Sequence, residues 1–221
     1  MGRILAWTAA SAIALAPLAG CASPGVAAPL GSGAGAGPCA PLEDDGIDYA
    51  RVPANPRALD EAVSRARADY AQLRSAAGLP DGPVAGDTVR VLSWGGMLPG
   101  RTGITATRNA AGGWDVEKVT DMARQPGKDQ PAEAPRLSRG TLTEAEARRL
   151  TALVADQCLY REPTYFDRMT PTTDGGEAMC MDGADAVVEI SAGGRRHASF
   201  HACHAYGRVA EVVAPLWQAT E

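Results

Sequence analysis

Apolar residues recur at helical spacing between Leu59 and Ala77. They follow Asn55-Pro56, which is typical of a helix start, because Asn caps free backbone amides and Pro suits the first turn. Gly78 then interrupts the pattern. We therefore predict a helix that begins at Pro56 and ends near Gly78.

Strand signals follow this helix. Residues 88–94, 103–108 and 114–119 are rich in β-branched and aromatic side chains. The glycine-containing segment 109–113 predicts a hairpin loop between the last two. Residues 121–140 are polar and include three prolines, so we expect an exposed loop there.

Two further helices are indicated. Thr143 and Glu146 form a capping box, in which each side chain satisfies a free backbone amide, and the helix after it should end near Cys158. Apolar spacing over residues 209–216 predicts a last helix despite an interior proline. The sum is an α+β fold: an antiparallel sheet of about five strands with two or three packed helices.

A hairpin is predicted over residues 185–202, and its turn decides which side chains are buried. A three-residue turn, Ala192–Gly194, gives one consistently apolar face that includes Ala198 and Phe200. A two-residue Gly193-Gly194 turn mixes polar and apolar residues on both faces, so we prefer the longer turn. The other face then carries cross-strand pairs, Glu189 with His197 and Asp185 with His201.

Charge and motifs narrow the function. The 221 residues carry a net charge of −5, which argues against a nucleic-acid partner because phosphate binding needs clustered basic residues. The sequence has no Gly-x-Ser-x-Gly, His-Glu-x-x-His or Gly-x-x-x-x-Gly-Lys-Ser/Thr motif. We therefore favour a protein without catalytic activity, with a hydrolase whose acids converge only in the fold as an alternative.

The N-terminal segment has the parts of an export signal. Arg3 is followed by an uncharged apolar run, Ile4–Pro17, that is shorter than the ~20 residues of a spanning helix. The run leads into Leu18-Ala19-Gly20-Cys21, which resembles the lipobox of bacterial lipoproteins. The resemblance implies that residues 1–20 are removed and that Cys21 carries palmitate-type acyl chains.

This resemblance also implies a location and a domain order. Acylated Cys21 would bind the lipid bilayer, and Ala22 in place of Asp favours the outer membrane, facing the periplasm. Residues 21–38 would form the lipidated N-terminus and a flexible tether, because they are mostly Gly, Ala and Pro. Residues 39–221 would form one α+β domain.

Export changes the interpretation of the four remaining cysteines. In an oxidising compartment an even number of cysteines predicts disulfides, and four allow three connectivities. We favour Cys180–Cys203, which ties the start of the predicted hairpin to its end, and with it Cys39–Cys158. Cys158–Cys180 is the main competing pair.

All three histidines lie within residues 197–204. Imidazole suits zinc or copper, so His201 and His204, with Asp185 as an oxygen ligand, are candidate metal ligands. The alternative is a set of carboxylate–imidazole pairs on a half-exposed strand face, with no cofactor. We favour the alternative, because the nearby Cys203 is expected in a disulfide.

The C-terminal third also resembles the end of small uncharacterised bacterial envelope proteins, through Asp182-Gly183, Val187-Val188-Glu189, Gly194, His197 and a short closing helix. We thus expect a membrane-anchored envelope lipoprotein with a binding or structural domain, whose partner is another envelope component. A periplasmic zinc- or copper-binding protein that uses the 197–204 cluster is the second hypothesis.

Overall fold

The computed structural model describes residue 39 and residues 45–80, 86–95, 100–122, 134–203 and 205–219. Its helices are α1 (Pro56–Ala76), α2 (Glu144–Ala155), the short 3₁₀ helix η1 (Leu159–Arg161) and α3 (Gly207–Gln218). Its strands are β1 (Thr88–Gly95), β2 (Gly100–Arg108), β3 (Trp114–Met122), β4 (Arg136–Thr141), β5 (Tyr165–Phe166), β6 (Met169–Pro171), β7 (Glu177–Met179), β8 (Ala184–Ala192) and β9 (Arg195–His201).

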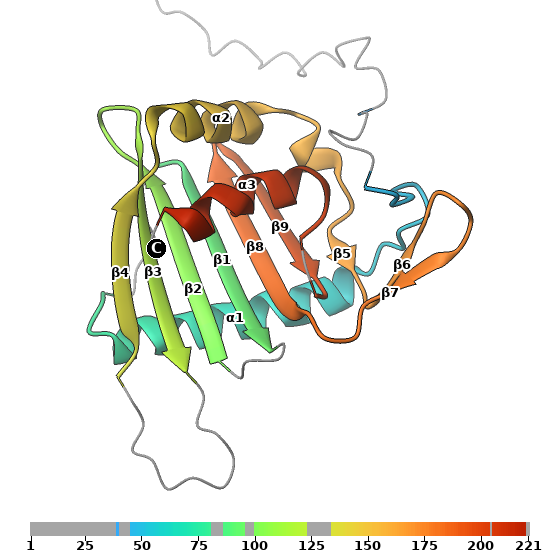
Figure 1. The fold of residues 1–221 in the computed structure, drawn as a ribbon, viewed down its shortest axis with the longest axis horizontal. Helices are drawn as coiled ribbons and strands as arrows, with labels where there is room; N and C mark the ends of the chain where they lie inside the picture. Colours follow the sequence, from blue (N-terminus) through green and yellow to red (C-terminus); the bar gives the residue numbers. More distant parts are fainter. Residues whose placement is uncertain are drawn as a thin grey trace, which may run out of the picture. The chain divides into compact units, whose positions relative to one another are not determined.

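Seven strands form one mixed sheet in the order β4-β3-β2-β1-β8-β9-β5, and β6 and β7 form a separate two-stranded sheet. Every pair in the large sheet is antiparallel except β5–β9. Helix α1 crosses one face, whereas α2 and α3 cover the other (Figure 1). The sheet is thus the middle of three layers.

Both faces of the sheet are packed against helices. The larger core lies between the sheet and α2 and α3, and includes the fully buried Trp114, Leu150 and Leu216. The smaller core lies under α1, where Tyr70 and Leu73 pack on the sheet. Because each strand presents apolar residues to both sides, its sequence alternates less clearly than that of a strand with one solvated face.

Helix α1 forms as its sequence predicts. The side chain of Asn55 accepts a hydrogen bond from the amide of Ala58 at 3.2 Å, and Pro56 occupies the first turn. Gly103 makes room for this helix on β2, because a Cβ there would lie 2.6 Å from the ring of Tyr70. The strand glycine therefore permits close helix–sheet packing.

The capping box at the start of α2 is confirmed. The amide of Glu146 donates to the Thr143 hydroxyl at 3.3 Å, and the Glu146 carboxylate accepts from the amide of Thr143 at 2.8 Å. The last helix is also confirmed as α3, which contains Pro215 within its final turn. Helix α2 ends at Ala155, and Cys158 follows in the turn that leads to η1.

The α+β class is confirmed, but the sheet is larger than expected and is not purely antiparallel. All of strand β4 except Thr141 lies in the segment 121–140, which was predicted to be a loop. Arg136 and Arg139 make this strand look polar, as is common for the edge of a sheet. The short strands β5, β6 and β7 were also not predicted from the sequence.

The preferred register of the β8–β9 hairpin is wrong. Ala192 pairs with Arg195, so the turn contains only Gly193 and Gly194, with φ angles of +57° and +75°. Two positive φ angles define a type I′ turn, whose twist matches that of the strands and which favours Gly-Gly. The longer turn would be favoured only if one face of the hairpin were solvated, whereas both faces are covered.

The register changes every cross-strand pair on this hairpin. Glu189 faces Ala198 rather than His197, and Ala186 rather than Asp185 faces His201. The expected carboxylate–imidazole pairs therefore do not form.

Two disulfides staple the fold, and they are the two pairs favoured from the sequence. Cys39 is bonded to Cys158, with 5.4 Å between their Cα atoms, and Cys180 is bonded to Cys203 with 6.1 Å. Gly183 lies against the second bond, since a Cβ there would come within 2.5 Å of the Cys203 backbone. Among the described residues, no helix has the length and apolar character needed to cross a membrane.

The type I′ turn predicts opposite effects of two substitutions at Gly193, where a Cβ would meet no neighbouring atom. Gly193→Asn should leave the free energy of unfolding almost unchanged, because Asn tolerates positive φ. Gly193→Val should lower it by about 1–2 kcal/mol, since a left-handed backbone strains a β-branched residue. Equal effects in urea unfolding would contradict the two-residue turn.

Candidate functional site

The histidine strand β9 turns its polar side chains toward the core. Ala198 and Phe200 pack against the α1 core, so the alternating residues His197, Ser199 and His201 face the opposite side of the sheet. All three are buried. The strand face that the sequence analysis expected to be half-exposed is therefore interior.

His201 is held by a hydroxyl and by aromatic rings. Its Nε2 lies 2.9 Å from Oγ of Ser199, and its ring stacks on Phe166 with 4.8 Å between centroids. A serine and an imidazole at this distance resemble a nucleophile and its base. However, both side chains have no exposed surface, so this pair acts as a hydrogen bond within the core.

His197 is buried in a more apolar setting. The edge of its ring meets the ring of Tyr160, with 6.2 Å between centroids, and its Nε2 has no hydrogen-bond partner among the described residues. Burial lowers the pKa of His197 from 6.5 to about 4, because the charged imidazolium is poorly solvated there. His197 is therefore neutral near pH 7.

The structure does not bring the proposed metal ligands together. Asp185 shares the α1 side of β8 with Val187, and its carboxylate pairs with Arg168 at 2.8 Å. His201 lies on the other side of the sheet, and His204 is outside the described residues. Within the described part of the chain, no three His, Cys, Asp or Glu side chains are grouped as metal ligands would be.

The α1 face of the sheet carries two rows of mostly polar residues beside the helix. We call them the polar rows. Cross-strand register aligns Arg196, Ser191, Thr88, Thr107, Asp115 and Thr141 in the first, and Ala198, Glu189, Arg90, Thr105, Glu117 and Arg139 in the second. Basic, acidic and hydroxyl side chains are thus intermixed across six strands.

Two grooves hollow these rows. One of about 390 Å³ lies over β1, β8 and β9, and the other of about 650 Å³ lies over β2, β3 and β4. In the first, Arg67 of α1 donates to Glu189 at 2.5 and 2.9 Å. The guanidinium of Arg90 lies 5.8 Å from the centre of the Tyr70 ring, within the range of a cation–π contact.

Charges in the second groove are also paired. Glu117 accepts from Arg74 at 2.5 Å and lies 3.2 Å from Arg139. The Tyr70 hydroxyl is hydrogen-bonded to the hydroxyl of Thr105 at the edge of α1. Both grooves therefore present hydrogen-bond donors and acceptors in fixed positions, on positively and negatively charged side chains. This arrangement suits recognition of a polar ligand by hydrogen bonds.

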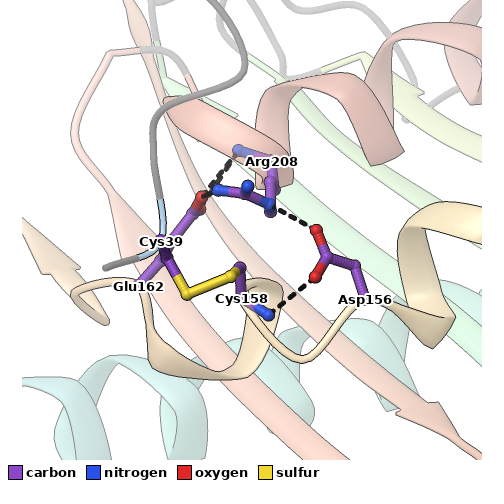
Figure 2. Close-up of a disulfide and its surroundings, with 5 residues drawn as sticks. All are labelled: Cys39, Asp156, Cys158, Glu162 and Arg208. Carbon is purple, nitrogen blue, oxygen red and sulfur yellow. Dashed lines mark hydrogen bonds and ion pairs between the residues drawn. A yellow bond between two sulfur atoms is a disulfide. The ribbon is translucent and has the colours of Figure 1, made fainter. Parts of the chain in front are cut away.

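A buried arginine network lies at the opposite side of the sheet, where α3 begins. Nε of Arg208 donates to Asp156 at 2.7 Å, and its Nη1 donates to Glu162 at 3.0 Å (Figure 2). The side chains of Arg208 and Glu162 are 7% and 9% exposed, so this pair is interior. Asp156 also accepts from the amide of Cys158, whose sulfur is bonded to Cys39.

Glu162 also completes the start of α3. Tyr206 occupies the N-cap position but makes no side-chain cap, and both oxygens of Glu162 instead accept from the amide of Arg208 at 3.1–3.2 Å. Gly207 has φ +58°, and a Cβ there would lie 2.8 Å from the carboxylate. Burial raises the pKa of Glu162, although the Arg208 guanidinium opposes that rise.

The arginine network and the polar rows were not predicted from the sequence. The rows have a visible signal, because Thr88, Arg90 and Glu117 alternate with buried valines along their strands. The network has almost none: Arg208 and Glu162 are 46 residues apart, and charged residues are rarely buried.

Comparisons with known proteins do not assign this chain to a family. No protein-family model, no curated protein and no solved structure matches it. We therefore infer function from the geometry of the described residues and from the N-terminal sequence.

Burial of neutral His197 predicts a stability that depends on pH. Its folded-state pKa lies below the ordinary value of 6.5, so its contribution is complete above pH 6.5 and is lost as the pH falls toward 4. In chemical unfolding, acidification from pH 6.5 to pH 4 should lower the free energy of unfolding of the original protein by up to about 3 kcal/mol through His197, and His197→Phe should remove this part of the loss. A variant that loses as much stability on acidification as the original protein would contradict a buried, neutral His197.

Proposed function

We propose that this chain is a membrane-anchored envelope lipoprotein whose domain binds a polar envelope component through the polar rows and performs no catalysis. Its anchor would be acylated Cys21, and the lipid bilayer would be its first partner. It would occupy the outer membrane and face the periplasm. The main observation that supports this proposal is the presence of two disulfides.

Both disulfides favour an oxidising compartment. They close loops with sequence separations of 119 and 23 residues, and bonds of this kind persist outside the cytoplasm, where thiols are not kept reduced. Cys39 lies 18 residues after Cys21, so the first disulfide would hold the domain end of the tether. Export, lipidation and this staple are therefore mutually consistent.

The grooves support binding rather than catalysis. One carboxylate in each groove is held by an arginine of α1, Glu189 by Arg67 and Glu117 by Arg74. A catalytic acid or base needs a reactive, accessible group, whereas the Ser199–His201 pair is enclosed in the core. Fixed polar groups across several strands suit the recognition of a partner that offers its own hydrogen-bonding groups.

The histidine-based zinc or copper hypothesis gains no support from this geometry. A shared ion needs ligands that converge, but His201 and Asp185 face opposite sides of the sheet. The hydrolase hypothesis would need converging acids, and in the grooves Glu189 and Glu117 are paired with arginines.

Intact mass spectrometry of the membrane-extracted protein tests the anchor. We expect a chain that begins at Cys21 and carries the mass of acyl groups. Cys21→Ser should abolish the acyl mass, while Cys39–Cys158 stays oxidised. An unmodified Cys21, or cleavage at another residue, would overturn the lipoprotein proposal.

A further inference from the structure

Three methionines stand out on the surface. Met169, Met179 and Met181 are 41%, 63% and 74% exposed, and they are the only large hydrophobic side chains in the described segments that are exposed. All belong to the β6–β7 hairpin or the residues directly after it. Exposed thioethers concentrated in one small element therefore need an explanation that core packing does not supply.

The register brings two of these side chains together. Met169 is paired with Met179 across β6 and β7. The pair before it, Arg168–Cys180, is hydrogen-bonded, since the amide of Cys180 donates to Arg168 O at 2.9 Å. The pair Thr172–Gly176 is also hydrogen-bonded, with the amide of Thr172 3.0 Å from Gly176 O. Because hydrogen-bonded and non-hydrogen-bonded pairs alternate along an antiparallel ladder, Thr170–Ala178 is the hydrogen-bonded pair on the other side of Met169–Met179.

Met169 and Met179 are thus a non-hydrogen-bonded pair, in which the Cα atoms are only about 4.5 Å apart and the side chains are closest. Thr170, in the next pair along the ladder, is buried, so its side chain points to the face opposite the two methionines. Both methionine side chains therefore project from the same outward face of the hairpin.

The third methionine, Met181, lies two residues after Met179 along the chain. Cys180 separates Met179 from Met181 and is bonded to Cys203, which anchors the tripeptide to the end of β9. Because both cysteines are spent in that bond, no thiolate is on offer in this part of the surface. The thioethers are the soft ligands that remain.

We propose that Met169, Met179 and Met181 form a site for a soft monovalent cation of the Cu(I) type. Thioether sulfur prefers such ions, whereas zinc and other harder divalent ions prefer imidazole and carboxylate. Methionine is flexible enough to adapt its sulfur to an ion without moving the backbone. This site is distinct from the histidine cluster and from the polar rows.

Thioether ligation has a signature that separates it from ligation by histidine. A thioether has no proton to lose, so its affinity for a soft ion is nearly constant between pH 7 and pH 5. Imidazole, with an ordinary pKa near 6.5, loses affinity over that range because protons compete with the metal. The pH dependence of binding therefore identifies the ligand type.

Titration with Ag(I), which has the charge of Cu(I) and no redox step under these conditions, tests the site. The probe is the full oxidised chain with Cys21→Ser, so that no free thiol competes, and its six methionines carry ¹³C-labelled methyl groups. We expect the methyl signals of Met169, Met179 and Met181 to shift together and to saturate at one equivalent. The shift should be the same at pH 7 and pH 5.

Substitution by leucine provides the matched comparison. Leucine keeps the apolar volume and removes the sulfur, and these positions are exposed, so the fold should persist. The triple variant Met169→Leu, Met179→Leu, Met181→Leu should weaken Ag(I) binding by at least about tenfold. Absence of methyl shifts, equal binding by the triple variant, or affinity that falls sharply at pH 5 would each overturn the proposal.

Discussion

Arg208 places a positive charge in the interior at the start of α3. The packing of α2 and α3 depends on the carboxylates that pair with this charge. Asp156 at the end of α2 and Glu162 after η1 both accept from its guanidinium. The end of α2, Glu162 after η1 and, 46 residues later, Arg208 at the start of α3 thereby meet at one point (Figure 2). Isolated buried charges are costly, so Arg208 and Glu162 stabilise each other in the interior, and Asp156 contributes from a partly exposed position.

The same network determines where two helices begin and end. Asp156 is the C-cap residue of α2, and Glu162 supplies the N-terminal cap of α3 that Tyr206 does not provide. The amide of Cys158 also donates to Asp156, so the arginine network and the Cys39–Cys158 bond meet at one residue. In the proposed function, the network and this disulfide would stabilise the part of the domain that lies next to the tether.

Local signals were sufficient for the helices but not for the sheet. Asn55, Thr143 and Glu146 determine helix starts through contacts within four residues, and the sequence predicts these correctly. The β8–β9 register depends on helices that cover both faces, so a rule that one face is polar chose the wrong turn. Capping by Glu162 and the pairing of Met169 with Met179 depend on contacts between segments, which no local pattern reveals.

Unfolding measurements on Arg208→Met test the central role of the network most directly, with Arg149→Met as the control. Arg149 forms an exposed pair with Glu211 between the same two helices. The buried substitution should lower the free energy of unfolding by about 3–5 kcal/mol, since it leaves Glu162 without its cation, and the exposed one by at most about 1 kcal/mol. Similar small losses for both variants would contradict a helical layer that depends on Arg208.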